Sequence, residues 1–147
     1  MNKAESADLI LKLYDLRREE KMREARNWII GFFPETAQEI MQAMIDAETS
    51  AKYRMVVSYW DMAAAFVNHG AIDEDLFNDV NGEHIMVFSK IEPFLEELKT
   101  MLGNPNYLHN LEKLILKSPD ARDVLHKRRE LMKRWMQARN ETGKSAV

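Results

Sequence analysis

The pattern of apolar and polar positions is helical from one end of the chain to the other. Apolar residues recur three and four positions apart, and no alternating run of β-branched residues predicts a strand. The spacing predicts helices over about 4–33, with a bend or break near 19–21, and then over about 36–47, 49–69, 73–81, 83–102, 105–117 and 119–139. We therefore expect an all-α fold, a single irregular bundle of six to seven helices over residues 1–140, followed by a disordered tail over 141–147.

The helix expected at about 49–69 is apolar on almost every side. Its polar residues Arg54, Ser58, Asp61 and Asn68 fall within about 80° of one another on a helical wheel. A helix that is apolar over so wide an arc is expected at the buried centre of a bundle. The polar stripe then needs hydrogen-bonding partners, because buried polar groups are rarely left unpaired.

Local signals mark where several of these helices begin and end. Gly70 can take the left-handed conformation that closes a helix, and Asp73 is a good N-cap for the helix that follows. Thr36 and Glu39 have the spacing of a capping box. Pro93 lies on the outer side of the helix at 83–102 and predicts a bend toward the core.

The sequence YWDMAAAFVNHGAIDEDLF (59–77), followed by NGEHIMVFSKIEPFLEEL (81–98), carries three short motifs. They are an aromatic–acidic pair, a Gly-hydrophobic-Asp turn and an acidic helix start, here Trp60-Asp61, Gly70-Ala71-Ile72-Asp73 and Glu74-Asp75. The segment resembles the core of a family of small bacterial all-helical proteins catalogued only as a domain of unknown function. The resemblance implies a helical fold and supplies no activity.

Composition limits the compartment in which we expect the protein and the kinds of catalytic or metal site that it can form. The chain has no Cys, which excludes disulfides, thiolate metal sites and cysteine nucleophiles. No apolar stretch approaches the length of a transmembrane helix, so we expect a cytoplasmic protein without a membrane span. Nucleotide-binding glycine motifs, a serine nucleophile elbow and an HExxH motif are all missing from the sequence. We therefore expect no cofactor, no bound metal and no catalytic residues.

The polar stripe and the residues after it still supply a candidate binding site. Its members are Arg54, Asp61, Asn68, His69, Glu83 and His84. One hypothesis is a small-ligand or metal-dependent enzyme centred on Asp61, His69 and Glu83. The other hypothesis is that the stripe is a structural network that fixes the register of the helices.

Two further pairs have helical spacing that suits metal ligands. They are His109 with Glu112 and Asp123 with His126, each three residues apart. A charged helical protein is expected to contain such pairs by chance, so they do not change the expectation that no metal is bound.

Charge is divided unevenly along the chain. Residues 1–116 hold 12 Lys/Arg and 20 Asp/Glu, a net charge of −8, whereas residues 117–147 hold 9 and 4, a net charge of +5. In the last helix, apolar residues including Leu131 and Trp135 alternate with cations. These cations are Lys127, Arg128, Arg129, Lys133 and Arg134. This pattern is typical of a terminal helix with a solvated basic face, and equally of a helix over 122–139 that binds nucleic acid or an anionic membrane surface.

The sequence favours a non-enzymatic regulatory or scaffolding protein that acts through protein–protein contacts. Self-association is expected because the two ends of the chain carry opposite charge and because Met and aromatic residues are frequent enough to leave an apolar patch exposed.

Overall fold

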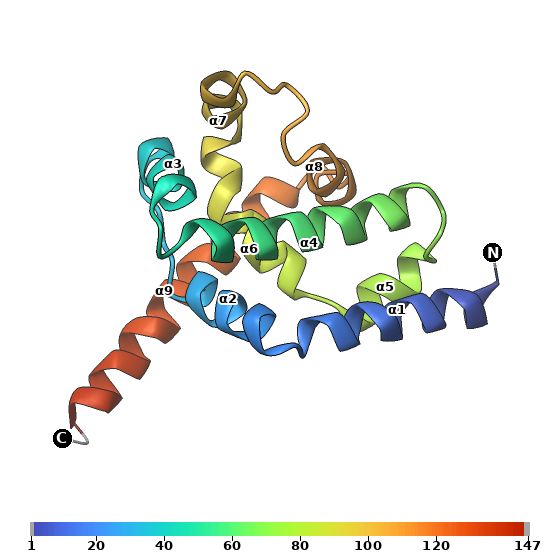
Figure 1. Ribbon diagram of the computed structural model, residues 1–147, viewed down its shortest axis with the longest axis horizontal. Helices are drawn as coiled ribbons and strands as arrows, with labels where there is room; N and C mark the ends of the chain where they lie inside the picture. The colour runs from blue at the N-terminus through green and yellow to red at the C-terminus, as the bar shows by residue number, and fades with distance from the viewer. Residues whose placement is uncertain (1, 146–147) are drawn as a thin grey trace.

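The computed structural model describes residues 2–145 and is helical throughout, with no strand in that range (Figure 1). The all-α prediction is therefore confirmed. In chain order the elements are α1 (Lys3–Arg17), α2 (Glu20–Ile30), α3 (Ala37–Ile45), α4 (Ser50–Asn68), α5 (Glu74–Val80), α6 (Glu83–Ile91), the 3-10 helix η1 (Glu92–Phe94), α7 (Leu95–Leu102), α8 (His109–Ile115) and α9 (Ala121–Ser145).

The predicted count of six to seven helices is wrong for the described residues. Helices α6 and α7 continue into one another through η1 as a single bent rod, so the nine α-helices form eight helical units. The additional unit arises near the N-terminus, where α1 ends at Arg17 and α2 begins at Glu20. Glu19 has extended backbone angles, and its carboxylate accepts a hydrogen bond from the amide of Met22, so it caps a new helix.

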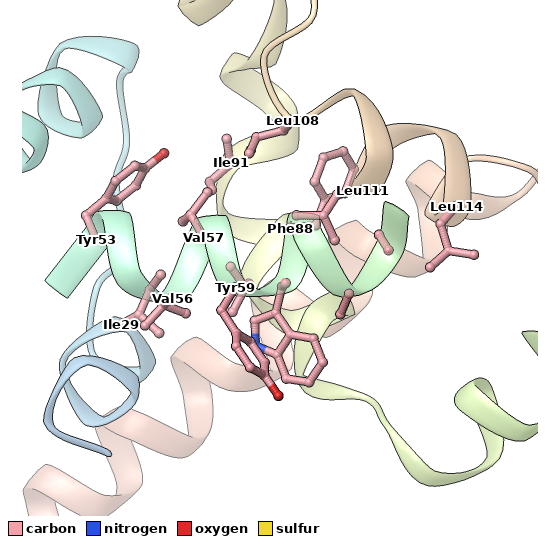
Figure 2. Close-up of a cluster of buried hydrophobic side chains, with 14 of the residues drawn as sticks. Ile29, Tyr53, Val56, Val57, Tyr59, Phe88, Ile91, Leu108, Leu111 and Leu114 are labelled. Carbon is pink, nitrogen blue, oxygen red and sulfur yellow. The ribbon is translucent and has the colours of Figure 1, made fainter. Parts of the chain in front are cut away.

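Helix α4 lies at the centre of the fold. It packs against α2, α3, α5 and α8. Figure 2 shows its side chains pointing in several directions, with Val56 beside Ile29 of α2 and with Leu111 and Leu114 reaching in from α8. Both Val56 and Trp60 are at most 1% exposed, so the predicted buried central helix is present.

The predicted turn signals work as expected. Gly70 and Gly103 follow α4 and α7 with positive φ angles of 79° and 62°, where a side chain would be strained. The Asp73 carboxylate accepts a hydrogen bond from the amide of Leu76 and so caps α5. Exposed Pro93 lies in η1, where the α6–α7 rod bends.

The last helix is longer than the sequence predicts. Helix α9 begins at Ala121, two residues later than predicted, and continues to Ser145. Residues 141–145 are therefore helical where a disordered tail is predicted, and the final residues 146–147 lie outside the described range. The only glycine there, Gly143, is not enough to end a helix, because it costs only about 1 kcal/mol relative to Ala. The end of α9 projects beyond the body of the protein (Figure 1).

None of the helices in residues 2–145 is both long and apolar enough to cross a lipid bilayer.

Candidate functional site

A cluster of charged and aromatic side chains joins α1, α2, α4 and α6. The carboxylate of Glu83 accepts hydrogen bonds from the Nε of Arg26 at 3.0 and 3.1 Å and from the indole Nε1 of Trp60 at 2.9 Å. The side chains of Glu83 and Arg26 are 14% and 28% exposed, and Trp60 is 1% exposed. This is a largely buried ion pair in which both carboxylate oxygens accept hydrogen bonds from protein donors.

A second guanidinium lies over the same tryptophan. The guanidinium carbon of Arg17 is 5.2 Å from the centre of the Trp60 ring and 5.2 Å from the centre of the Tyr14 ring. Its Nε is buried and has no hydrogen-bond partner. Arg17 also forms no ion pair with any residue in the described part of the chain, so the cluster of Arg17, Arg26 and Glu83 carries an excess positive charge.

His84 also packs against Trp60. The imidazole is 1% exposed, and its ring centre is 5.6 Å from that of Trp60 and 5.0 Å from that of Phe77. Burial lowers the pKa of His84 to about 4, and the charges of Arg128 and Arg17 act in the same direction. The imidazole is therefore neutral at physiological pH. Its Nδ1 is buried without a partner beside a small cavity of about 270 Å³ between α5, α8 and α9.

Lys90 is a second buried titratable group on α6. It is 1% exposed, and its ammonium donates hydrogen bonds to the carbonyls of Ile30 and Phe32 at 3.2 and 2.8 Å. The same ammonium lies 3.6 Å from the centre of the Phe33 ring. Burial lowers the pKa of Lys90 to about 7, with a smaller contribution from the charge of Lys133. The observed contacts are structural, because they satisfy carbonyls at the end of α2.

The polar stripe of α4 divides into two parts. Asp61 accepts hydrogen bonds from the amide of Leu111 at 3.0 Å and from the side chain of Asn110 at 3.2 Å, and Asn68 donates to the carbonyl of Asn110 at 3.0 Å. These bonds hold the N-terminal turn of α8. The residue preceding α8 is Leu108, with φ 54°, which has no side-chain acceptor, so Asp61 provides the missing cap from another helix.

The other part of the stripe contacts only its own helix. The Arg54 guanidinium donates to the carbonyl of Ser50 at 3.3 Å, and the Ser58 hydroxyl donates to the carbonyl of Arg54. Both side chains are exposed. A solvent-facing hollow of about 480 Å³ lies beside them, between α4 and the loop at 104–108.

The predicted binding residues therefore form no single site. Glu83 and His84 lie next to each other on the Trp60 side of α4, whereas Asp61 and Asn68 face α8. His69 is exposed at the end of α4, and no contact joins it to Asp61 or Glu83. The geometry thus places the three residues of the enzyme hypothesis in three different environments.

The residues proposed as metal ligands are also apart. No group of three or more His, Asp or Glu side chains suited to hold a metal ion occurs among the described residues. Glu112 pairs with Lys99 at 2.9 Å, and His126 contacts Arg129 at 3.1 Å.

The basic residues of the last helix fall on two different faces. Lys127, Arg128 and Arg134 are exposed, as the solvated-face interpretation requires. Arg129 instead donates a hydrogen bond to the carbonyl of Ser89 at 2.6 Å, and Lys133 lies near Lys90 on the inner side. Arg129 therefore fixes α9 to α6.

Sequence reasoning missed Arg17, Arg26 and Lys90 as buried or half-buried groups. A signal was present for two of them. Arg26 is four residues after Met22 and three before Ile29, on the apolar face of α2, and Lys90 lies among the apolar positions of α6. A cation on an apolar helix face indicates a buried partner.

Comparison with known proteins gives a family and no function. A family model described as a domain of unknown function (DUF4760) matches residues 3–118. No curated protein and no solved structure matches the chain. The match confirms the resemblance seen at 59–98 and extends it over most of the chain, so the chain belongs to this family of unknown function.

Proposed function

We propose that this member of the DUF4760 family is a non-enzymatic regulatory or scaffolding module that acts through protein–protein contacts. The contact surface is the outward face of α9, and its partner is a second copy of the chain. The observation that carries the proposal is a solvent-exposed apolar stripe on α9, bordered by cations, on the side of the helix that the body does not cover.

Helix α9 has two apolar faces, and the body uses one of them. Leu125 is 1% exposed and packs inward, and Met136 approaches Gly31 at the end of α2. The outer stripe consists of Leu131 and Trp135, which are 38% and 64% exposed and lie four positions apart on one side of the helix. Val124 continues this line toward the start of α9, where it is 39% exposed and borders the hollow between α5, α8 and α9. Such a line is the pattern by which a helix seats in a partner's groove.

Charge supports a second copy as the partner. The exposed cations Lys127, Arg128 and Arg134 flank the stripe. Residues 117–147 carry a net charge of +5 and residues 1–116 a net charge of −8, so α9 of one molecule complements the body of another. The same charge disfavours direct pairing of two α9 helices, because their cations would face each other. The expected contact is therefore heterologous, with two different surfaces meeting.

Sedimentation equilibrium tests the proposal. We expect wild-type protein to associate and Trp135→Asp to weaken association at least 30-fold, because a central aromatic anchor contributes about 2 kcal/mol or more. Ile45→Asp is the matched control, since Ile45 is an apolar residue on α3 that is 70% exposed. A wild-type protein that is monomeric at every concentration, or equal weakening by both variants, would contradict the proposal.

Binding assays separate this function from a nucleic-acid or anionic membrane-surface binder that uses the same helix. Short duplex DNA, single-stranded RNA and vesicles with anionic lipid are tested at low and high salt, since phosphate-dominated binding weakens steeply with salt. The double variant Arg128→Glu/Arg134→Glu removes exposed cations and leaves Arg129 in place. The rival function is supported if the wild-type protein is monomeric, binds one of these ligands in a salt-sensitive way, and loses that binding in the double variant. The protein would then be a nucleic-acid or membrane-surface binder, and the protein-contact function would be wrong.

A further inference from the structure

We infer that the groove between α1 and α5 binds a single-chain anionic amphiphile, an acyl chain that ends in a carboxylate or a similar small anion. This site is separate from the outer stripe of α9, and it does not depend on the function proposed for that stripe.

The groove is apolar along most of its length. Helices α1 and α5 pack side by side (Figure 1). Their side chains line a groove with a volume of about 440 Å³. Leu11, Tyr14 and Val80 border it and are 63%, 49% and 56% exposed, which is high for large apolar side chains. Ala7, Ile10 and Leu76 complete the apolar lining. The volume falls within the range of small-molecule sites.

One end of the groove is positively charged and lacks a counter-ion. Arg17 lines this end, and its buried Nε has no hydrogen-bond partner. Arg18 lies close by, with its guanidinium carbon 5.7 Å from the centre of the Tyr14 ring. Neither arginine forms an ion pair within residues 2–145, and the Glu83 carboxylate of the adjoining cluster is already held by Arg26 and Trp60. An anionic head group in the groove would pair with the solvent-accessible part of the Arg17 guanidinium, which has no carboxylate partner in residues 2–145.

The dimensions suit a chain of medium length. Ala7 and Arg17 are ten residues apart on α1, a distance of roughly 15 Å at the helical rise, which matches an extended acyl chain of roughly ten to twelve carbons. The apolar tail would cover Leu11 and Val80, and the head would lie at Arg17 and Arg18. Such an amphiphile can come from solution or from a lipid bilayer.

Isothermal titration calorimetry of the full chain with decanoate, below its micelle-forming concentration, tests the assignment. We expect decanoate to bind at least ten times more tightly than decanol, because only decanoate offers a charge to the arginines. Leu11→Asp should abolish binding by placing a carboxylate in the groove. Leu16→Asp is the matched control, since Leu16 is 55% exposed on the opposite face of the same helix. Circular dichroism verifies that each variant is folded.

Three results would overturn the assignment. They are no heat of binding with decanoate, equal affinity for decanol and decanoate, or a Leu11→Asp variant that binds as the wild type does. If the wild-type chain does not bind decanoate and Leu11→Asp changes its oligomeric state, the groove is a protein interface instead. Trp135→Asp should leave decanoate binding unchanged, so the groove proposal and the α9 proposal are tested independently.

Flotation with vesicles that contain an anionic lipid identifies the source of the amphiphile. For a chain that binds decanoate, flotation that is lost in Leu11→Asp assigns the ligand to a bilayer, whereas the absence of flotation assigns it to a soluble molecule. Both results support the groove. Flotation that persists in Leu11→Asp, together with no decanoate binding, would refute it.

Discussion

Acid should destabilise this protein through one histidine, His84. The imidazole is 1% exposed and packs against the rings of Trp60 and Phe77, with no partner for its Nδ1. Protonating it in place would bury a cation near Arg128 and Arg17. The structure therefore resists protonation of His84 more strongly than the unfolded chain does.

The loss of stability in acid follows from the difference between the pKa of His84 in the folded protein and its unperturbed value. The pKa of His84 is about 4 in the folded protein and 6.5 when unperturbed, a difference of 6.5 − 4 = 2.5 pH units. Between these values the unfolded chain binds a proton that the folded protein does not, so stability falls as the pH drops from 6.5 to 4. At 1.36 kcal/mol per unit, the loss by pH 4 is about 3 kcal/mol. For a domain of this size the melting temperature should fall by roughly 10 °C from this group.

Urea unfolding followed by circular dichroism measures this loss at steps between pH 7 and pH 4. His84→Phe places an uncharged ring against Trp60 and Phe77, so the variant should lose about 3 kcal/mol less than the wild type over this range. His69→Gln is the control, because it replaces an exposed histidine that lies outside this cluster of rings. Parallel pH profiles for wild type and His84→Phe would refute the reasoning, and so would an NMR titration of His84 with a midpoint near 6.5.

Three further substitutions test the buried polar contacts by urea unfolding. Asp61→Ala removes the cap of α8 and should cost about 2 kcal/mol, whereas Ser58→Ala on the same stripe should cost almost nothing; equal effects would contradict the capping role. Lys90→Met should remove a rise in stability between pH 7 and 9.5, because folded Lys90, with a pKa of about 7, releases its proton earlier than the unfolded chain does. The same pH profile in both proteins would show that Lys90 is not the group responsible. Glu83→Gln should cost about 2 kcal/mol or more by leaving Arg26 without its carboxylate, and a neutral result would mean that this pair is solvated.

The elements with local signals could be predicted from the sequence. The wide apolar arc of 53–69 identified the central helix, and Gly70 and Asp73 marked the turn that follows it. These features depend on residues a few positions apart, which is the range over which helical periodicity and capping act. The break at Arg18-Glu19 was harder to locate because the residues around it are charged on most sides and give no apolar periodicity.

The contacts between distant segments could not be predicted in the same way. Asp61 caps a helix 50 positions later, and Arg26 pairs with Glu83 across 57 positions. A polar residue on an apolar face shows that a partner is needed, but helical periodicity does not show which segment supplies it. For the same reason, the sequence grouped Asp61, His69 and Glu83 as one candidate site, whereas folding separates them.

The proposal that α9 mediates self-association is tested most directly by labelling that helix. The chain has no Cys, so Ala138→Cys places a single nitroxide spin label on the exposed side of α9, and Ala47→Cys places one on an exposed turn as a control. We expect the label at position 138 to lose mobility as protein concentration rises, to regain it at high salt, and to remain mobile in Trp135→Asp, while the label at position 47 does not change. Unchanged mobility at position 138 across all concentrations would contradict self-association through α9.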